Sequence, residues 1–452
     1  MAFTQDTLLT ISMMTNEALR VLENSLTFTK QLDRQYDGKF GVAGAKIGTI
    51  LNIRKPPRYA GRIGQALGAE NAQETSVPLA LSTQRGVDLY FTSADLVLNI
   101  DAFSKRFIKP AVAAVANGID LDGVNVLEPQ IYNMIGTPGT PPAAALTYLQ
   151  AGQRLDEEAC PREDRKLVMP PAFVPPIVDS LKGLFQSSEQ IAEQYRKGMM
   201  GIGLGFEWYM DQNLRPQVAG PLGGTPVVSG ANQSGNTLLT SGWTAAAGVR
   251  MNVGDVFTMP NVFAVNPVAY NNQTNSRIST GALRQFTVVS TASSDATGAA
   301  TLQIYPPIIP PAGATVNFQF ASNVNQGTTT GVLGANFADA NNPYSQSITL
   351  GPAFQNVTTS PASGAAITPA FTANQTSNQA MAFFPEFATM ACADLLLPGG
   401  VDMAARAADD QLGISLRLVR AYDINADRFP TRLDIIYGFA LLYGEFATRI
   451  AG

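Results

Sequence analysis

The stretch RKPPRYAGRIGQALGAENAQ, from Arg54 to Gln73, is strongly basic and reaches its first acidic residue only at Glu70. It stands between KIGTILNI (46–53) and SVPLALST (76–83), where apolar residues recur with the period of two that is typical of β-strands. A connection of about twenty residues is uncommon inside a compact domain and usually has a function. The sequence therefore predicts two strands joined by a long basic loop. Its basic residues are Arg54, Lys55, Arg58 and Arg62.

The overall composition is that of a large and weakly charged protein. The 452 residues leave room for several domains, 45% of them are hydrophobic, and only 14% are charged. The net charge of −5 disfavours a surface that wraps nucleic acid. There is no apolar run of the roughly eighteen residues that a membrane helix needs. The N-terminus lacks the basic start of a signal peptide, so we expect a cytoplasmic product.

Few side chains suited to catalysis or metal binding are present. The chain contains no histidine, which removes His-based general bases, catalytic triads and metal sites. Cys160 and Cys392 lie far apart in the sequence, and we expect two buried thiols instead of a disulfide. The adjacent carboxylates Asp156, Glu157 and Glu158 point to different sides of a helix, so we interpret them as a solvated face and not as an acid/base pair.

Helical periodicity marks several parts of the first two hundred residues. Residues 1–40 read as an arm with a short helical pattern, and residues 140–200 predict three helices, the first ending before Pro161. A further helix is predicted over residues 103–120, with Pro110 at a kink or a restart. The apolar stripe of this helix consists of Phe103, Phe107, Ala111, Val115 and Ile119.

Charge almost disappears between residues 221 and 380. Short β-like runs such as DVFTM, RQFTVVS and ATLQIYPP predict a separate β domain of barrel or sandwich type there. Beyond it, ISLRLV (414–419) and RLDIIYGFALLYG (432–444) predict further strands. The β domain therefore looks inserted between two halves of an α+β body. The six charged residues of the segment are Arg250, Asp255, Arg277, Arg284, Asp295 and Asp339.

Two short motifs resemble ligand sites but favour plain turns. YDINADRF places Asp423, Asn425 and Asp427 at the spacing of a calcium loop, but Arg428 stands where that loop requires glycine. We interpret it as a polar turn between strands. GIGLGF (201–206) follows a predicted helix and precedes a predicted strand, which is the reverse of the order in a dinucleotide site. A tight turn is the better interpretation.

The basic loop has three interpretations: a solvated surface, a phosphate-binding segment, and a contact with a neighbouring subunit. Arg-rich loops that bind nucleic acid usually carry several aromatic residues, and this stretch has only Tyr59. A long two-stranded hairpin is marginally stable alone in water and needs a surface to lie on. The subunit contact, in which arginines meet carboxylates across an interface, is therefore favoured.

Taken in order, these parts form a pattern that resembles the major capsid proteins of tailed bacteriophages, which have the HK97-like fold. More narrowly, the pattern is similar to the coat proteins of short-tailed phages that carry an inserted β-barrel. RGVDLYFTSADL (85–96) looks like the return strand of the extended loop in these proteins. FSKRFIKPAVAAVANGID (103–120) looks like the start of the spine helix of the peripheral domain. GISLRLVRAYDINADRFPTRLDIIYG (413–438) looks like the closing strands.

The resemblance implies an α+β, HK97-like fold with an inserted β-barrel domain. Its implied parts are an N-terminal arm (1–40), an extended β-hairpin loop (41–92), a peripheral domain with the spine helix (93–140), the first part of the axial domain (141–215), the inserted domain (216–380) and closing strands of the axial and peripheral domains (381–452). The implied inter-subunit loop contacts are Arg54, Lys55, Arg58, Arg62 and Glu70. The implied spine-helix residues are Phe103, Arg106, Phe107 and Val115.

The function implied by the resemblance is self-assembly into an icosahedral shell around double-stranded DNA. Catalysis, cofactors, metals and a membrane are not expected. The implied partners are further copies of the chain in hexamers and pentamers, a scaffolding protein, a portal, a decoration protein and weakly contacted DNA. The protein would be made in the host bacterial cytoplasm and reside in the virion. The alternative is a β-rich glycan-binding or carbohydrate-active surface protein, for which Trp208 and Trp243 are the only tryptophans available to stack on sugars.

Overall fold

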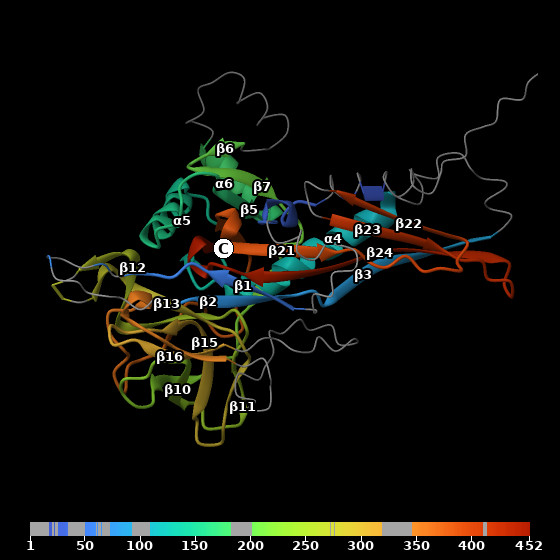
Figure 1. Cartoon of the computed structure of the whole chain (residues 1–452). Coiled ribbons are helices and arrows are strands. Elements are labelled where there is room, and N and C mark those ends of the chain that lie inside the picture. The colour runs from blue at the N-terminus through green and yellow to red at the C-terminus, as the bar shows by residue number, and fades with distance from the viewer. Residues whose placement is uncertain are drawn as a thin grey trace, which may run out of the picture. The chain divides into compact units, whose positions relative to one another are not determined.

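A computed structural model gives the fold, which is α+β with many strands and few helices (Figure 1). The chain divides into two compact units. Unit 1 contains residues 1–52, 78–123 and 389–440, and unit 2 contains residues 53–77, 124–388 and 441–452. The structure describes residues 18–19, 22, 26–34, 50–59, 61, 65, 73–92, 109–181, 201–271, 273–274, 276–318, 346–409 and 414–452.

Unit 1 is built on a five-stranded sheet in which β24 pairs with three other strands. The order is β21-β24-β23-β22, and β3 also pairs with β24 in antiparallel register, with Val87 opposite Leu433. The elements are β3 (Thr83–Thr92), α4 (Lys109–Leu127, to Gly123 in this unit), β21 (Ala388–Ala393), β22 (Met403–Asp409), β23 (Ile414–Arg420) and β24 (Arg428–Leu441).

Helix α4 lies along β3 and β24 (Figure 1). Its predicted apolar stripe is confirmed where the structure describes it, because Ala111, Val115 and Ile119 are buried. A bidentate ion pair fixes the helix to β3: Arg85 Nε and Nη2 donate to Asp122 at 2.7–3.0 Å. Phe103, Arg106 and Phe107 lie outside the described residues.

The centre of this sheet contains a fully buried carboxylate. Asp434 of β24 is 0% exposed and accepts from both Nε and Nη2 of Arg417 on β23, at 2.9 and 2.7 Å. Gln84 of β3 donates to the same carboxylate at 2.6 Å, and Arg432 lies 3.2 Å from it. One side chain therefore ties together three adjacent strands, which the alternation of apolar residues does not reveal.

The described part of unit 2 contains two larger sheets and the helices α5 and α6. A six-stranded sheet has the order β4-β25-β20-β5-β7-β6, and an eight-stranded sheet contains β9–β15 and β18. The elements are β4 (Met134–Gly136), α5 (Ala145–Glu157), β5 (Lys166–Met169), α6 (Val174–Leu181), β6 (Ile202–Gly203), β7 (Phe206–Met210), β8 (Gln217–Val218), β9 (Gly224–Val228), β10 (Gly235–Trp243), β11 (Gly248–Met251), β12 (Val256–Asn271), β13 (Ser276–Val288), β14 (Ala292–Ser294), β15 (Ala300–Ile308), β16 (Ala314–Phe318), β17 (Gln346–Leu350), β18 (Thr368–Pro369), β19 (Thr376–Ser377), β20 (Gln379–Phe383) and β25 (Ala447–Ala451). β1 (Ile50–Lys55) and β2 (Thr75–Ala80) form a two-stranded sheet, and the basic loop connects the end of β1 to the start of β2.

The predicted strands of the low-charge segment are confirmed. DVFTM lies at the start of β12, RQFTVVS in β13 and ATLQIYPP in β15. The side chains that these strands direct inward form one apolar core, in which the rings of Phe257 and Phe286 stack at 5.8 Å between centroids. The separate core beneath the six-stranded sheet contains Tyr148 of α5, whose ring lies 5.0 Å from that of Trp208.

Several local predictions are also tested by the structure. Cys160 and Cys392 are buried thiols, as expected, and burial raises the pKa of Cys160 to about 12. GIGLGF forms the turn between β6 and β7, with Gly201 and Gly205 at positive φ. Of the three helices predicted in residues 140–200, α5 and α6 are present and the third lies outside the described residues.

Replacing Asp434 with Asn is expected to destabilise the unassembled chain by about 3 kcal/mol, because it leaves the Arg417 guanidinium without its buried counter-ion. Urea-induced unfolding measures this loss. Asp402→Asn is the matched control, since Asp402 forms a partly exposed pair with Arg420 at 2.8 Å and should cost no more than about 1 kcal/mol. Equal losses in the two variants would show that the buried pair does not support the sheet.

Candidate functional site

The strands that border the basic loop are present where the sequence predicts them. β1 extends to Lys55 and β2 begins at Thr75, so residues 56–74 form the connection. Only part of this connection is described, and Arg62 and Glu70 lie outside the described residues. The alternation of β1 places Arg54 on the outside, where its side chain is 82% exposed and 3.7 Å from Glu74.

Arg58 is held within its own chain. Its Nη2 donates to the carboxylate of Glu445, which lies in the short helix η7 (Gly444–Phe446) directly before β25. The guanidinium also lies 6.0 Å from the ring of Phe354. Burial opposes ionisation of Glu445, but the charges of Arg58 and Lys55 outweigh it and hold the pKa of this carboxyl below its usual value. The ion pair joins the start of the loop to the end of the chain.

Lys55, the last residue of β1, is the second basic residue that points inward. Its Nζ lies 5.0 Å from the centre of the Tyr443 ring, a cation–π distance. It forms no ion pair with any residue that the structure describes. Burial lowers the pKa of Lys55 to about 8, and the nearby charge of Glu445 offsets only part of this effect.

A second buried ion pair lies beside the first. Nη1 of Arg284, on β13, donates to Glu158, which follows the end of α5; their side chains are 4% and 5% exposed. The guanidinium stacks over the ring of Tyr132 at 4.5 Å. The prediction that Glu158 belongs to a solvated face is wrong. In the structure α5 ends at Glu157, and Glu158 follows it and is buried. Helical periodicity could not show that its partner, Arg284, lies 126 residues away.

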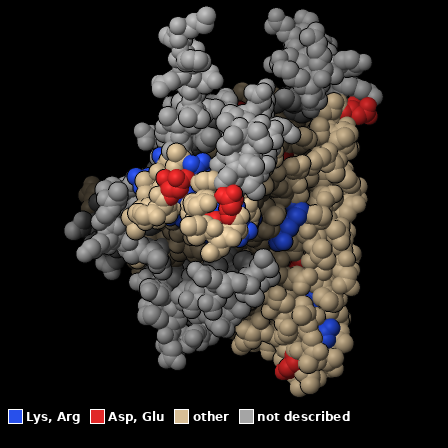
Figure 2. Space-filling model, turned by 90° about the vertical axis from the view of Figure 1, so that its right-hand side faces the viewer, with Lys and Arg blue, Asp and Glu red and all other residues tan. Residues whose placement is uncertain are grey.

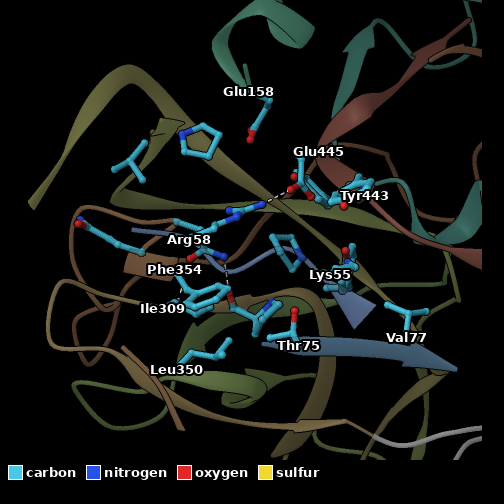
Figure 3. Close-up of a pocket in the computed structure, with 18 of the residues that line it drawn as sticks. Lys55, Arg58, Thr75, Val77, Glu158, Ile309, Leu350, Phe354, Tyr443 and Glu445 are labelled. Carbon is cyan, nitrogen blue, oxygen red and sulfur yellow. Dashed lines mark hydrogen bonds and ion pairs between the residues drawn. The ribbon is translucent and has the colours of Figure 1, made fainter. Parts of the chain in front are cut away.

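These residues line a cavity of about 140 Å³ in unit 2 (Figure 3). Its apolar lining includes Ile309, Leu350 and Phe354. Figure 3 shows the Arg58 side chain directed at Glu445. Among the described residues, three cations and two carboxylates line the cavity, so these groups carry one positive charge in excess when all are ionised. The charged lining residues are Lys55, Arg58, Glu158, Arg284 and Glu445.

Sequence reasoning missed the acidic half of this cluster. Glu445 follows a strand pattern and carries no motif, so nothing in the local sequence singles it out. Arg284 did offer a signal, since it is one of the few charges in residues 221–380, and a charge in such a segment requires a specific partner if it is buried. Asp255 and Arg277 of the same segment are buried as well.

The calcium-like motif forms a polar turn, in agreement with its interpretation. Asp423 pairs with Arg428 at 3.0 Å and accepts from the backbone N–H of Asn425. Asp427 instead accepts from the hydroxyl of Tyr422. Among the described residues, no group of three or more acidic or cysteine side chains is arranged to hold a metal ion.

The tryptophans on which a glycan site would depend are buried. Trp208 and Trp243 are 5% and 3% exposed, and their indole N–H groups donate to Gly203 and Thr240. Neither ring face is therefore available to stack on a sugar. Where the face in Figure 2 is described, it carries few charged side chains, and no large patch of one sign is seen there. Within the described part of the chain, no helix is long and apolar enough to cross a membrane.

Several solved phage structures are similar to this chain. A structure from Mycobacterium phage Che8 is 11% identical, with 94% of this chain and 90% of that chain covered and a TM-score of 0.40. The capsid structure of the cyanophage P-SCSP1u is 9% identical, with coverages of 93% and 88% and a TM-score of 0.40. The mature capsid of bacteriophage PhiM1 is 8% identical, with coverages of 92% and 86% and a TM-score of 0.37. These TM-scores assign no role to individual residues. No protein-family model and no curated protein matches the chain.

Replacing Glu158 with Gln is expected to destabilise the chain by about 3 kcal/mol, because it leaves the Arg284 charge buried without a counter-ion. Glu157→Gln is the control on the neighbouring residue. Glu157 pairs with Arg154 at 3.1 Å and is 22% exposed against 5% for Glu158, so its loss should cost less, about 1 kcal/mol. Chemical unfolding of both variants measures the difference, and a Glu158→Gln variant as stable as the wild type contradicts the assignment.

Lys55 makes the stability of the folded chain depend on pH in the alkaline range. Its pKa is about 8 in the folded chain and 10.5 when unperturbed, so between these values the unfolded chain binds a proton that the folded chain has lost. Stability contributed by this group therefore rises with pH across the window. Lys55→Met should be more stable than the wild type near pH 7, and this advantage should shrink by about 2 kcal/mol toward pH 9.5. A constant difference in unfolding free energy across that range contradicts the shift.

Proposed function

We propose that this chain is the major capsid protein of a tailed phage, with an HK97-like fold and an inserted β-barrel domain. Its copies assemble into an icosahedral shell that encloses double-stranded DNA, and the protein acts through contacts between subunits without catalysis. The proposal keeps the domain boundaries implied by the sequence, with residues 216–380 as the inserted domain.

The observation that best supports this proposal is the architecture of unit 1. Helix α4 lies along a long antiparallel sheet, as the resemblance implies for a spine helix and its closing strands. β24 has 14 residues, which corresponds to about 46 Å of extended chain. Leu396 and Ile424, in the connections between these strands, are 83% and 79% exposed. A long sheet with exposed apolar side chains at its turns suits a protein that contacts other copies of itself.

The basic loop has two roles in the proposal. Arg58 holds the base of the loop against the same chain through the ion pair with Glu445, and the charge of Lys55 acts on the same carboxylate. Arg54, Arg62 and Glu70 contact the neighbouring subunit. Arg54 suits this role since its side chain is almost fully exposed and only loosely paired with Glu74. Val115, which is buried in α4, supports the subunit core instead of an interface.

The proposed partners follow from assembly. Further copies of the chain form hexamers and pentamers, and a scaffolding protein, a portal and a decoration protein complete the particle. The packaged DNA is contacted weakly and without sequence preference, in agreement with a net charge of −5. The chain is made in the bacterial cytoplasm and resides in the virion.

Particle size tests the proposal directly. The chain, expressed with the genes that flank its own, should sediment as shells tens of nanometres across in a sucrose gradient and appear closed by negative-stain electron microscopy. A monodisperse 48 kDa species under the same conditions would contradict the capsid function.

Charge reversal tests the loop contact. Arg54→Glu should leave the subunit folded and reduce the yield of shells at least about tenfold, since it places a carboxylate where an acidic partner is proposed. Arg162→Glu, at an 80% exposed position outside the loop, is the control and should assemble normally. Arg58→Glu is unsuitable, because it would set two carboxylates against each other inside the subunit. If the Arg54→Glu variant forms shells in normal yield, the proposed loop contact is wrong.

A further inference from the structure

The cavity in unit 2 has more positive than negative charge in its wall. Arg58 is matched by Glu445 and Arg284 is matched by Glu158, each in a direct ion pair. Lys55 lines the same cavity, and no third carboxylate does so among the residues that the structure describes. Burial disfavours the charged form of the amine, as its lowered pKa shows. An additional negative charge in the cavity would therefore stabilise the ammonium.

The remaining wall selects the kind of anion. The lining also includes Pro306, Ile309, Leu350 and Phe354, which offer apolar contacts and no charge. A cavity of about 140 Å³ is close to the roughly 150 Å³ that accommodates a benzene ring in an engineered protein cavity. A small organic anion therefore fits better than a fully hydrated inorganic ion.

We propose that this cavity binds a carboxylate with a small apolar body, whose charge meets Lys55 and whose body packs against Ile309, Leu350 and Phe354. The carboxylate comes from a free small molecule or from an acidic side chain of another copy of the chain. Both sources offer the same chemistry to the cavity, and the ion pairs of Arg58 and Arg284 stay intact in either case.

Titration calorimetry on the unassembled chain tests binding with benzoate as the probe. Benzamide has the same shape without the charge, and it should bind at least about tenfold more weakly. Lys55→Met should weaken benzoate binding by a similar factor and leave the weak binding of benzamide unchanged. Lys30→Met removes the same charge from an exposed lysine of unit 1 and should bind benzoate as the wild type does.

Two outcomes overturn the proposal. The first is a folded wild-type chain that does not bind benzoate. The second is a Lys55→Met variant that binds benzoate as tightly as the wild type, since binding would then not depend on the surplus cation. Circular dichroism of each variant shows that loss of binding does not reflect loss of structure.

A second experiment distinguishes the two sources of the carboxylate, and it rests on the proposed assembly. If an acidic side chain of another copy occupies the cavity, saturating benzoate should reduce the yield of shells at least about tenfold, whereas benzamide should not. If the natural ligand is a free small molecule, benzoate binds and shells form normally. The calorimetry uses the unassembled chain, so its result does not depend on whether the protein forms a capsid.

Discussion

The ion pair between Arg58 and Glu445 organises the region on which the proposed function depends. It joins residues 387 positions apart and links the base of the basic loop to the segment that enters β25. The adjacent pair of Arg284 and Glu158 joins β13 to the end of α5 in the same way. Arg284 and Glu158 are almost fully buried, so removing either would leave a charge in a poorly solvated site, whereas the Arg58 side chain is 35% exposed and its pair is less costly to break. Together the two pairs favour one arrangement of the loop base, the helix end and the strands that they join.

The same principle operates independently in unit 1. Asp434 is completely buried and accepts hydrogen bonds from side chains of two neighbouring strands. Apolar alternation alone allows a strand to shift by two residues without exposing its hydrophobic face. A buried carboxylate with fixed donors does not tolerate such a shift, because its partners would move out of reach. Buried charge thus specifies register in unit 1, whereas in unit 2 it specifies how the loop base is closed.

The sequence was informative wherever a local pattern determined the structure. Period-two alternation located β1, β2 and the strands of the low-charge segment, and the stripe of Ala111, Val115 and Ile119 located α4. It could not identify partners far away in the chain. The pairing of β3 with β24, and the burial of Glu158, depend on contacts across hundreds of residues or on the direction of a turn. Four basic residues looked equivalent in the loop, but the structure separates an exposed Arg54 from inward-facing Lys55 and Arg58, and only their partners make the difference.

Lys55 differs from the charges of the three ion pairs discussed above, because its ammonium has no direct ion-pair partner among the described residues. Asp434, for example, accepts from two nitrogens of Arg417, so its burial is compensated within the chain. For Lys55 the compensation is incomplete, and its lowered pKa means that the folded chain stabilises the neutral amine more than the ammonium. Folding alone would favour an apolar side chain at this position, which already packs on the ring of Tyr443. The ammonium is therefore better explained by a group that binds against it than by the fold that surrounds it.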